Sequence, residues 1–393
     1  MNARDPHGPL AALRVVEIGS IGPGPFCAMM LADLGAEVIR VDRLDGAGPV
    51  GPGSDHAHEL MNRGRRSAGV DLKHPHGPGV VLRLVEQADV LIEGFRPGVA
   101  ERLGIGPAEC LARNPRLVYG RMTGYGQDGP GAQTVGHDLN YIAANGVLSM
   151  VGRHGQPPTP PLNLVGDIGG GGLILAFGLL AALLERNLSG RGQVVDAAMV
   201  DGAAVLATQF FGWVQTGEWS LDRGTNMIDS GAPYYEVYET ADGRWLSVAA
   251  VEPRFYAALL KLFELDAVDL PDRDDPATWP ELKATFAAVV RSRTREEWCA
   301  LAAGLDACVA PVLGPEEVEA DEHLSARGTF VRNDGVLQPA PAPRFSRTPA
   351  RLTRPPARPG EHTAEALADW GFSAADVADL RAAKVIARGD ANE

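Results

Sequence analysis

The sequence predicts an α/β fold, in which a large domain with a Rossmann-like open parallel sheet is joined to a smaller α+β domain. A chain of 393 residues is longer than one hydrophobic core usually organises, which indicates two domains. Residues 13–42 follow the order strand, glycine-rich turn, helix, strand, which is a βαβ unit. Beyond about residue 225 the pattern changes to a β-hairpin followed by helices.

The large domain is expected to begin with this βαβ unit. An apolar strand at 13–18 runs into the turn 19–25. A helix at 26–34 follows, and Gly35 ends it before a second strand at 36–42. The alternation continues along the chain, which favours a parallel sheet with helices on both faces. Further strands are expected at 68–72, 88–93, 117–122 and 193–197, and helices at 80–87, 107–113 and 172–186.

The second half of the chain predicts a smaller domain and a return to the first. An apolar helix is expected at 199–218, and a turn at 241–243 joins the hairpin strands 234–240 and 244–251. Further helices are expected at 254–262, 280–292, 294–304, 363–370 and 374–383, with a proline-rich extended segment at 330–360. The expected domains are 1–198 completed by 330–393, a linker helix at 199–224, a small domain at 225–320 and a return linker at 321–329.

The uncharged run 168–184 raises the question of a membrane span. It opens with glycines and ends at Glu185-Arg186, so we expect a helix too short to span a bilayer and buried in the core. The first 13 residues lack the apolar stretch of a signal peptide. No membrane span is therefore expected.

Composition narrows the class of function. The chain has 36 basic and 50 acidic residues, a net charge of −14, which argues against a nucleic-acid partner. Its four cysteines are scattered, as expected of free thiols in the reducing cytoplasm. The pairs His56/His58 and His74/His76 lie in Pro/Gly-rich loops without companion ligands, so no metal site is expected.

The glycine turn after the first strand differs from a dinucleotide fingerprint. Its sequence, Gly19-Ser20-Ile21-Gly22-Pro23-Gly24, has neither the GxGxxG spacing nor a permissive residue at Pro23. A nicotinamide cofactor is therefore not expected.

Two glycine-flanked turns place chemically different bases just ahead of helical stretches. His137 lies in Val135-Gly136-His137-Asp138-Leu139-Asn140-Tyr141, and Asp167 in the run 163–172. An imidazole and a carboxylate that approach one carbon from opposite sides suit proton abstraction next to a carbonyl, with return to either face. A surface role for the histidine, and helix capping by Asp138 or Asp167, are open alternatives at this level.

Basic residues crowd the first hundred or so positions of this acidic protein, several at strand ends where doubly wound folds bind ligands. Such a set suits a ligand with several phosphates, whereas each residue alone is more simply explained as a solvated charge. The set comprises Arg40, Arg43, Arg63, Arg65, Arg66, Lys73, Arg96 and Arg102.

From Leu13 to about Trp370 the chain resembles the family III CoA-transferase superfamily, and its Gly-His-Asp-x-Asn-Tyr string is similar to the α-methylacyl-CoA racemase branch. The resemblance implies interconversion of 2R and 2S epimers of a 2-methyl-branched acyl-CoA by 1,1-proton transfer through an enolate. His137 and Asp167 would be the two bases, and Glu252 would pair with His137. The backbone N–H of Asp167 would face the thioester oxygen.

The resemblance further implies an interlocked homodimer, with each site between two chains. Coenzyme A would be part of the substrate, and no separate cofactor is expected. The turn 22–25 would lie near the active site. The expected contacts to the CoA ester are Arg43, Val70, Asp71, Leu72, Lys73, Gly94, Phe95, Arg96, Arg102, Gly136, Asp138, Leu139, Asn140, Tyr141 and Asn163.

Two other functions fit parts of the pattern. In a family III CoA-transferase the same Asp167 would attack the thioester as a nucleophile, a route that does not need His137. A non-catalytic acyl-CoA carrier would explain the basic residues but not the two bases. Composition does not specify the acyl group.

Overall fold

The computed structural model describes residues 7–44 and 56–387, in two compact units. Each unit is built from segments that are separate in the sequence. The first comprises Met1–Asn145, Leu162–Leu206 and Ala326–Glu393, and the second comprises Gly146–Pro161 and Ala207–Ser325. The units are defined by internal packing, and the domain bounds expected from the sequence stay a prediction.

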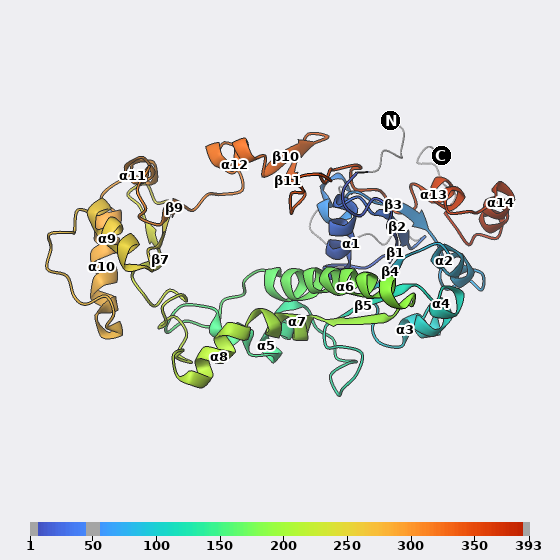
Figure 1. The fold of residues 1–393 in the computed structure, drawn as a ribbon, viewed down its shortest axis with the longest axis horizontal. Helices are drawn as coiled ribbons and strands as arrows, with labels where there is room; N and C mark the ends of the chain where they lie inside the picture. Colours follow the sequence, from blue (N-terminus) through green and yellow to red (C-terminus); the bar gives the residue numbers. More distant parts are fainter. Residues whose placement is uncertain (1–6, 45–55, 388–393) are drawn as a thin grey trace. The chain divides into compact units, whose positions relative to one another are not determined.

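The first unit contains a six-stranded parallel sheet (Figure 1), as the alternating sequence pattern predicts. The strand order is β3-β2-β1-β4-β5-β6, in which the direction of winding reverses between β1 and β4. In open sheets of this kind ligands bind at the carboxyl ends of the strands near that point. The strands are β1 Arg14–Ile18, β2 Glu37–Asp42, β3 Arg66–Gly69, β4 Val90–Glu93, β5 Val118–Thr123 and β6 Val194–Ala198.

Helices cover both faces of this sheet, and each face has its own core. Val15 and Val16 are neighbours on β1 but belong to different buried clusters, because successive strand residues point to opposite faces. The helices are α1 Pro23–Asp33, α2 Gly77–Val85, α3 Val99–Arg102, α4 Pro107–Arg113, α5 Asp138–Ala144, α6 Ile174–Ser189, α7 Met199–Leu206, α13 Thr363–Asp369 and α14 Ala374–Ala382. Two 3-10 turns, His56–His58 and Leu60–Asn62, precede β3.

The second unit contains a three-stranded antiparallel sheet in the order β7-β8-β9 with helices around it. Its core includes the fully buried Trp298 and Phe286. The elements are α8 Thr208–Thr216, β7 Tyr235–Glu239, β8 Trp245–Ala249, α9 Pro253–Leu262, α10 Trp279–Val290, α11 Arg295–Ala302 and β9 Val309–Pro311, with 3-10 turns at Val147–Met150 and Pro276–Thr278. α12 covers Glu322–Arg327, and the small antiparallel pair β10 Phe330–Asn333 and β11 Val336–Pro339 follows.

Three expected elements differ from the structure. The expected helix at 199–218 is two helices, because the backbone at Ala207 leaves helical values, with ψ at 9°. The segment at 330–360, expected to be extended throughout, begins with the hairpin of β10 and β11. The helix expected at 172–186 is preceded by a π-helix, Leu164–Leu173, that continues directly into α6.

The combined helix Leu164–Ser189 has 26 residues, so the expectation of a helix too short for a membrane span is wrong. By length and composition alone it passes the test for a span. One face packs in the core of the first unit through Leu175 and Leu179, which are fully buried. A core helix satisfies the same criteria, and this packing identifies it as one.

Candidate functional site

A cavity of about 740 Å³ lies at the carboxyl ends of β1, β2, β4 and β5 in the first unit. The turn 19–22 and the first turn of α1 follow β1, Arg43 follows β2, the segment 94–97 follows β4, and 124–125 follows β5. All of these segments line the cavity. The position is the one that parallel sheets of this order use for ligands.

The turn after β1 packs against Asp167. Gly22 has φ at +71°, a backbone conformation that residues with a side chain adopt at a cost. A Cβ atom at Gly22 would lie 3.2 Å from Oδ2 of Asp167. The turn therefore allows the backbone to approach this carboxylate closely.

Asp167 lies in the first turn of the π-helix and is half-buried in the wall of the cavity. Burial raises the pKa of its carboxyl group. A hydrogen bond of 3.2 Å from Nδ2 of Asn163 to Oδ2 of Asp167 acts in the opposite direction, because it stabilises the charged form. Asp138 raises this pKa further and His137 lowers it, both through their charge. A carboxyl group with a raised pKa is suited to accept and return a proton.

The backbone N–H of Asp167 is not available to a thioester oxygen, contrary to expectation. It donates to Oδ1 of Asp138 at 2.6 Å. The reason is local: N–H groups in the first turn of a helix lack an intrahelical acceptor, and the Asp138 side chain supplies one here. The carboxylate of Asp138 therefore contacts the backbone of Asp167, and its expected contact with the substrate stays a prediction.

His137 precedes α5 and is exposed to the same cavity as Asp167. Its backbone N–H donates to Oδ1 of Asn140 at 3.0 Å, which caps the start of the helix. The structure therefore brings together the two bases that the sequence places in separate glycine-flanked turns.

Tyr141 supports the turn that carries His137. Its buried hydroxyl donates to the carbonyl oxygen of Gly136, and burial raises the pKa of the phenol to about 12, so that it stays protonated. The ring packs on Gly124, where a Cβ atom would lie 2.1 Å from the ring. Tyr141 also lines the cavity, so its ring forms part of the wall beside His137.

Comparison with known proteins assigns the family. The family model described as "CoA-transferase family III" matches residues 10–363. The chain belongs to CoA-transferase family III. The protein named "Alpha-methylacyl-CoA racemase" from Mus musculus is 46% identical over 380 residues, covering 96% of this chain and 97% of the relative. The protein of the same name from Homo sapiens is 45% identical over the same shares. A crystal structure of a CAIB/BAIF family protein from Brucella suis has a TM-score of 0.78 and 28% identity, covering 93% of this chain and all of that chain.

In this CoA-transferase family III protein, about half of the expected CoA contacts lie in the cavity wall. Those that line it are Arg43, Gly94, Phe95, Arg96, Gly136, Tyr141 and Asn163. Those that do not are Val70, Asp71, Leu72, Lys73, Arg102, Asp138, Leu139 and Asn140. The side chain of Val70 is buried in the core, and its backbone N–H donates to the carbonyl oxygen of Asp42 at 2.8 Å. The contacts of this second group with coenzyme A stay predictions.

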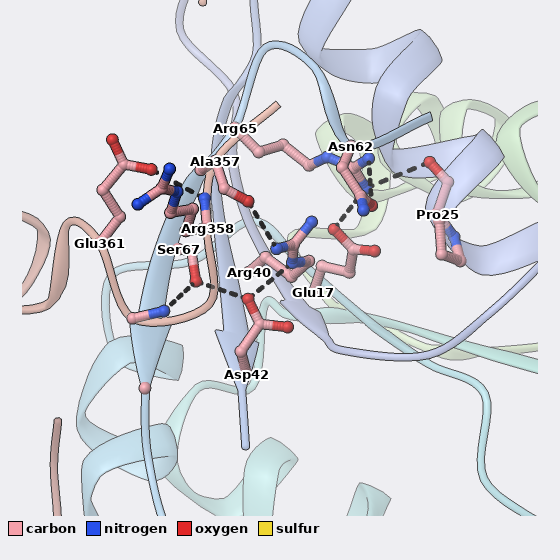
Figure 2. A network of polar contacts seen from close by, with 12 residues as sticks. Glu17, Pro25, Arg40, Asp42, Asn62, Arg65, Ser67, Ala357, Arg358 and Glu361 are labelled. Carbon is pink, nitrogen blue, oxygen red and sulfur yellow. Dashed lines mark hydrogen bonds and ion pairs between the residues drawn. The ribbon is translucent and has the colours of Figure 1, made fainter. Parts of the chain in front are cut away.

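Four of the basic residues are buried arginines that form ion pairs within the fold. Figure 2 shows two of these pairs, those of Arg65 and Arg40. Arg65 donates to Glu17 at 2.7 Å, and Arg40 donates to Asp42 at 2.7 Å. These pairs hold strands and turns together, and Arg40 and Asp42 also line the cavity. The other two pairs are Arg63 with Asp33 at 2.6 Å, and Arg66 with Glu37 at 2.5 Å.

Several cavity residues were not predicted from the sequence. Asp42 and Thr123 are the last residues of β2 and β5, so the strand-end rule was sufficient to find them. Asn62 and Met199 reach the cavity from positions without a sequence signal, whereas Arg40 belongs to the basic set named from the sequence. In the described part of the chain, no three His, Cys, Asp or Glu side chains are grouped as metal ligands would be.

Glu252 belongs to the second unit, where it is exposed and directly precedes Pro253 at the start of α9. The two units are described separately, so its pairing with His137 stays a prediction.

Proposed function

We propose that this family III protein is an α-methylacyl-CoA racemase. The observation that carries the proposal is that His137 and Asp167 line one cavity at the carboxyl ends of the sheet. The identity of 46% with the mouse racemase over almost the full length of both chains supports it. The substrate class is a 2-methyl-branched acyl-CoA, and coenzyme A enters only as part of that substrate.

The chemistry needs two proton carriers of comparable basicity on opposite faces of Cα. One base accepts the Cα proton, and the C–H electron pair moves onto the thioester oxygen to form an enolate. The other base, already protonated, then donates its proton to the opposite face of Cα. Burial of Asp167 raises the pKa of its carboxyl group and so brings it nearer to the pKa of an imidazole.

The CoA phosphates are proposed to meet the exposed guanidinium groups of Arg43 and Arg96, which lie in the cavity wall after β2 and β4. Arginine side chains bind phosphate oxygens in pairs of hydrogen bonds. Arg102 and Lys73 are exposed but lie outside the cavity wall, so they are proposed as peripheral contacts.

The active form is proposed to be a homodimer in which Glu252 of one chain orients His137 of the other. Support comes from the outer face of α6, where Phe177, Leu184 and Leu188 are 73%, 70% and 91% exposed. Large apolar residues grouped on one helix face are typical of protein interfaces. Co-expression of His137→Ala with Glu252→Ala tests the composite site, since some mixed dimers would regain one complete site. If folded mixed dimers recover no activity, His137 and Glu252 either pair within one chain or do not interact. The cytoplasmic localisation stays a prediction.

The rival within the family is a CoA-transferase that uses Asp167 as a nucleophile. Incubating each epimer of 2-methyldecanoyl-CoA in heavy water, with no acceptor acid, separates the two functions. The racemase exchanges the Cα proton and interconverts the epimers. Exchange of neither epimer, with CoA transfer once an acceptor acid is added, would replace the racemase by the transferase.

A further inference from the structure

The carboxylate of Asp138 is held in an unusual environment behind Asp167. Asp138 is the first residue of α5 and is only 6% exposed. Its Oδ1 accepts the backbone N–H of Asp167 at 2.6 Å, whereas its Oδ2 is buried without a hydrogen-bond partner. An unsatisfied buried carboxylate oxygen destabilises a fold, so a native one requires an explanation.

The neighbouring backbone is shaped to admit this carboxylate. A Cβ atom at Gly166 would lie 2.5 Å from Oδ1 of Asp138 and 3.2 Å from its main-chain oxygen. Gly166 is buried, so a side chain there has no room to turn away. The glycine before Asp167 thus serves the contact between the two aspartates.

We propose that the carboxylate of Asp138 positions Asp167 and does not itself bind the substrate. The inference rests on the proposed racemase function. The hydrogen bond fixes the first turn of the π-helix and with it the direction of the Asp167 side chain. The negative charge of Asp138 also opposes ionisation of Asp167, which makes Asp167 a stronger base for its face of the substrate.

Other charged groups around Asp167 do not supply this effect. His137 acts in the opposite sense, Asn163 donates a hydrogen bond to the carboxylate, and Tyr141 is a protonated phenol. On the elements packed against the π-helix the remaining charged residues are Asp33, Arg121, Glu185, Arg186, Asp196 and Asp201. Among these, Asp33, Arg121 and Arg186 are engaged in ion pairs of their own.

The test uses Cα exchange from each epimer of 2-methyldecanoyl-CoA in heavy water across a pH series. Asp167→Asn first identifies the epimer that Asp167 deprotonates, because exchange from that epimer is lost. For this epimer, Asp138→Asn should lower kcat about tenfold, the effect of one ordinary interaction, with KM within roughly twofold. The acidic limb of its kcat profile should move to lower pH. For the other epimer, both the rate of exchange and the acidic limb of the kcat profile should stay unchanged. Asp128→Asn, on an exposed loop of the same unit, is the matched control.

Several results would overturn the proposal. One is a rise in KM for both epimers at unchanged kcat, which would make Asp138 a substrate ligand. Equal losses for both epimers with no movement of the limb would make its role purely structural. If Asp138→Asn does not fold, Asp138→Glu keeps the charge and carries the same prediction of a loss confined to one epimer. If neither variant folds, Asp138 is required for folding and not for positioning Asp167. If the wild type exchanges neither epimer, the proposed function fails instead.

Discussion

Arg65 donates from Nη1 both to Oε2 of Glu17, at 2.7 Å, and to the carbonyl oxygen of Pro25, at 3.2 Å. The two charged side chains are 1% and 0% exposed. One buried guanidinium thus joins β1 to the first turn of α1, directly after the turn that packs on Asp167, and Figure 2 shows both contacts. The ion pair therefore supports the site from below without touching a substrate.

Removing one partner of this pair should destabilise the protein strongly. Arg65→Met leaves the Glu17 carboxylate buried and unpaired, which typically costs about 3–5 kcal/mol. Differential scanning calorimetry should show a large fall in Tm. Arg113→Ala removes an exposed pair with Glu86, and such pairs contribute about 0–1 kcal/mol, so its Tm should hardly change. Equal Tm values for the two variants would contradict a structural role for Arg65.

Gly22→Ala should impair the reaction at the Asp167 face. The new methyl group would lie 3.2 Å from Oδ2 of Asp167, so the carboxylate must shift, and a loss in kcat of about tenfold or more is expected. Gly129→Ala is the control, because Gly129 also has positive φ, at +90°, but nothing lies within 4 Å of its Cβ position. Both variants carry a similar backbone strain of roughly 1 kcal/mol. Equal kcat values in the two variants would separate Gly22 from catalysis.

Asn163→Ala should move the pH dependence in the direction opposite to Asp138→Asn. The Asn163 amide stabilises the ionised carboxylate of Asp167, and its removal raises the pKa of that group further. A base is lost when it becomes protonated, so the acidic limb of kcat for the Asp167 epimer should move to higher pH. A limb that moves to lower pH would show that Asn163 does not act on this carboxylate.

Arg43→Ala and Arg96→Ala should each raise KM by about tenfold or more with a smaller effect on kcat, the pattern of lost uniform binding. Arg102→Ala, outside the cavity wall, should change KM less. Dephospho-CoA esters should also bind more weakly to the wild type. Unchanged KM values in the first two variants would leave these arginines as surface charges.

The sequence predicted the sheet because its strands are short apolar runs between glycine turns and helices. It also predicted that His137 and Asp167 share one site, because each lies in a distinct motif, and both line the cavity, whereas their roles as bases stay a prediction. The sequence did not show that Arg65 is buried whereas Arg96 is exposed. The burial of an arginine depends on partners such as Glu17, which is 48 residues away from Arg65. The sequence also did not predict that the helix is interrupted at Ala207, because the apolar pattern continues across this residue. The hydrogen bond from the Asp167 N–H to Asp138 joins two turns that are separate in the sequence, and a local sequence pattern does not predict such a contact.

Exchange of the Cα proton in heavy water, measured for each epimer with His137→Ala and Asp167→Ala, tests the two-base account most directly. Each variant should lose racemisation by about 10²–10⁴-fold, the usual contribution of a general base. Each should still exchange one epimer, and the two variants should retain opposite ones, because the surviving base serves the other face. Near-normal racemisation by Asp167→Ala, or retention of the same epimer by both variants, would contradict the assignment of His137 and Asp167 to opposite faces of one carbon.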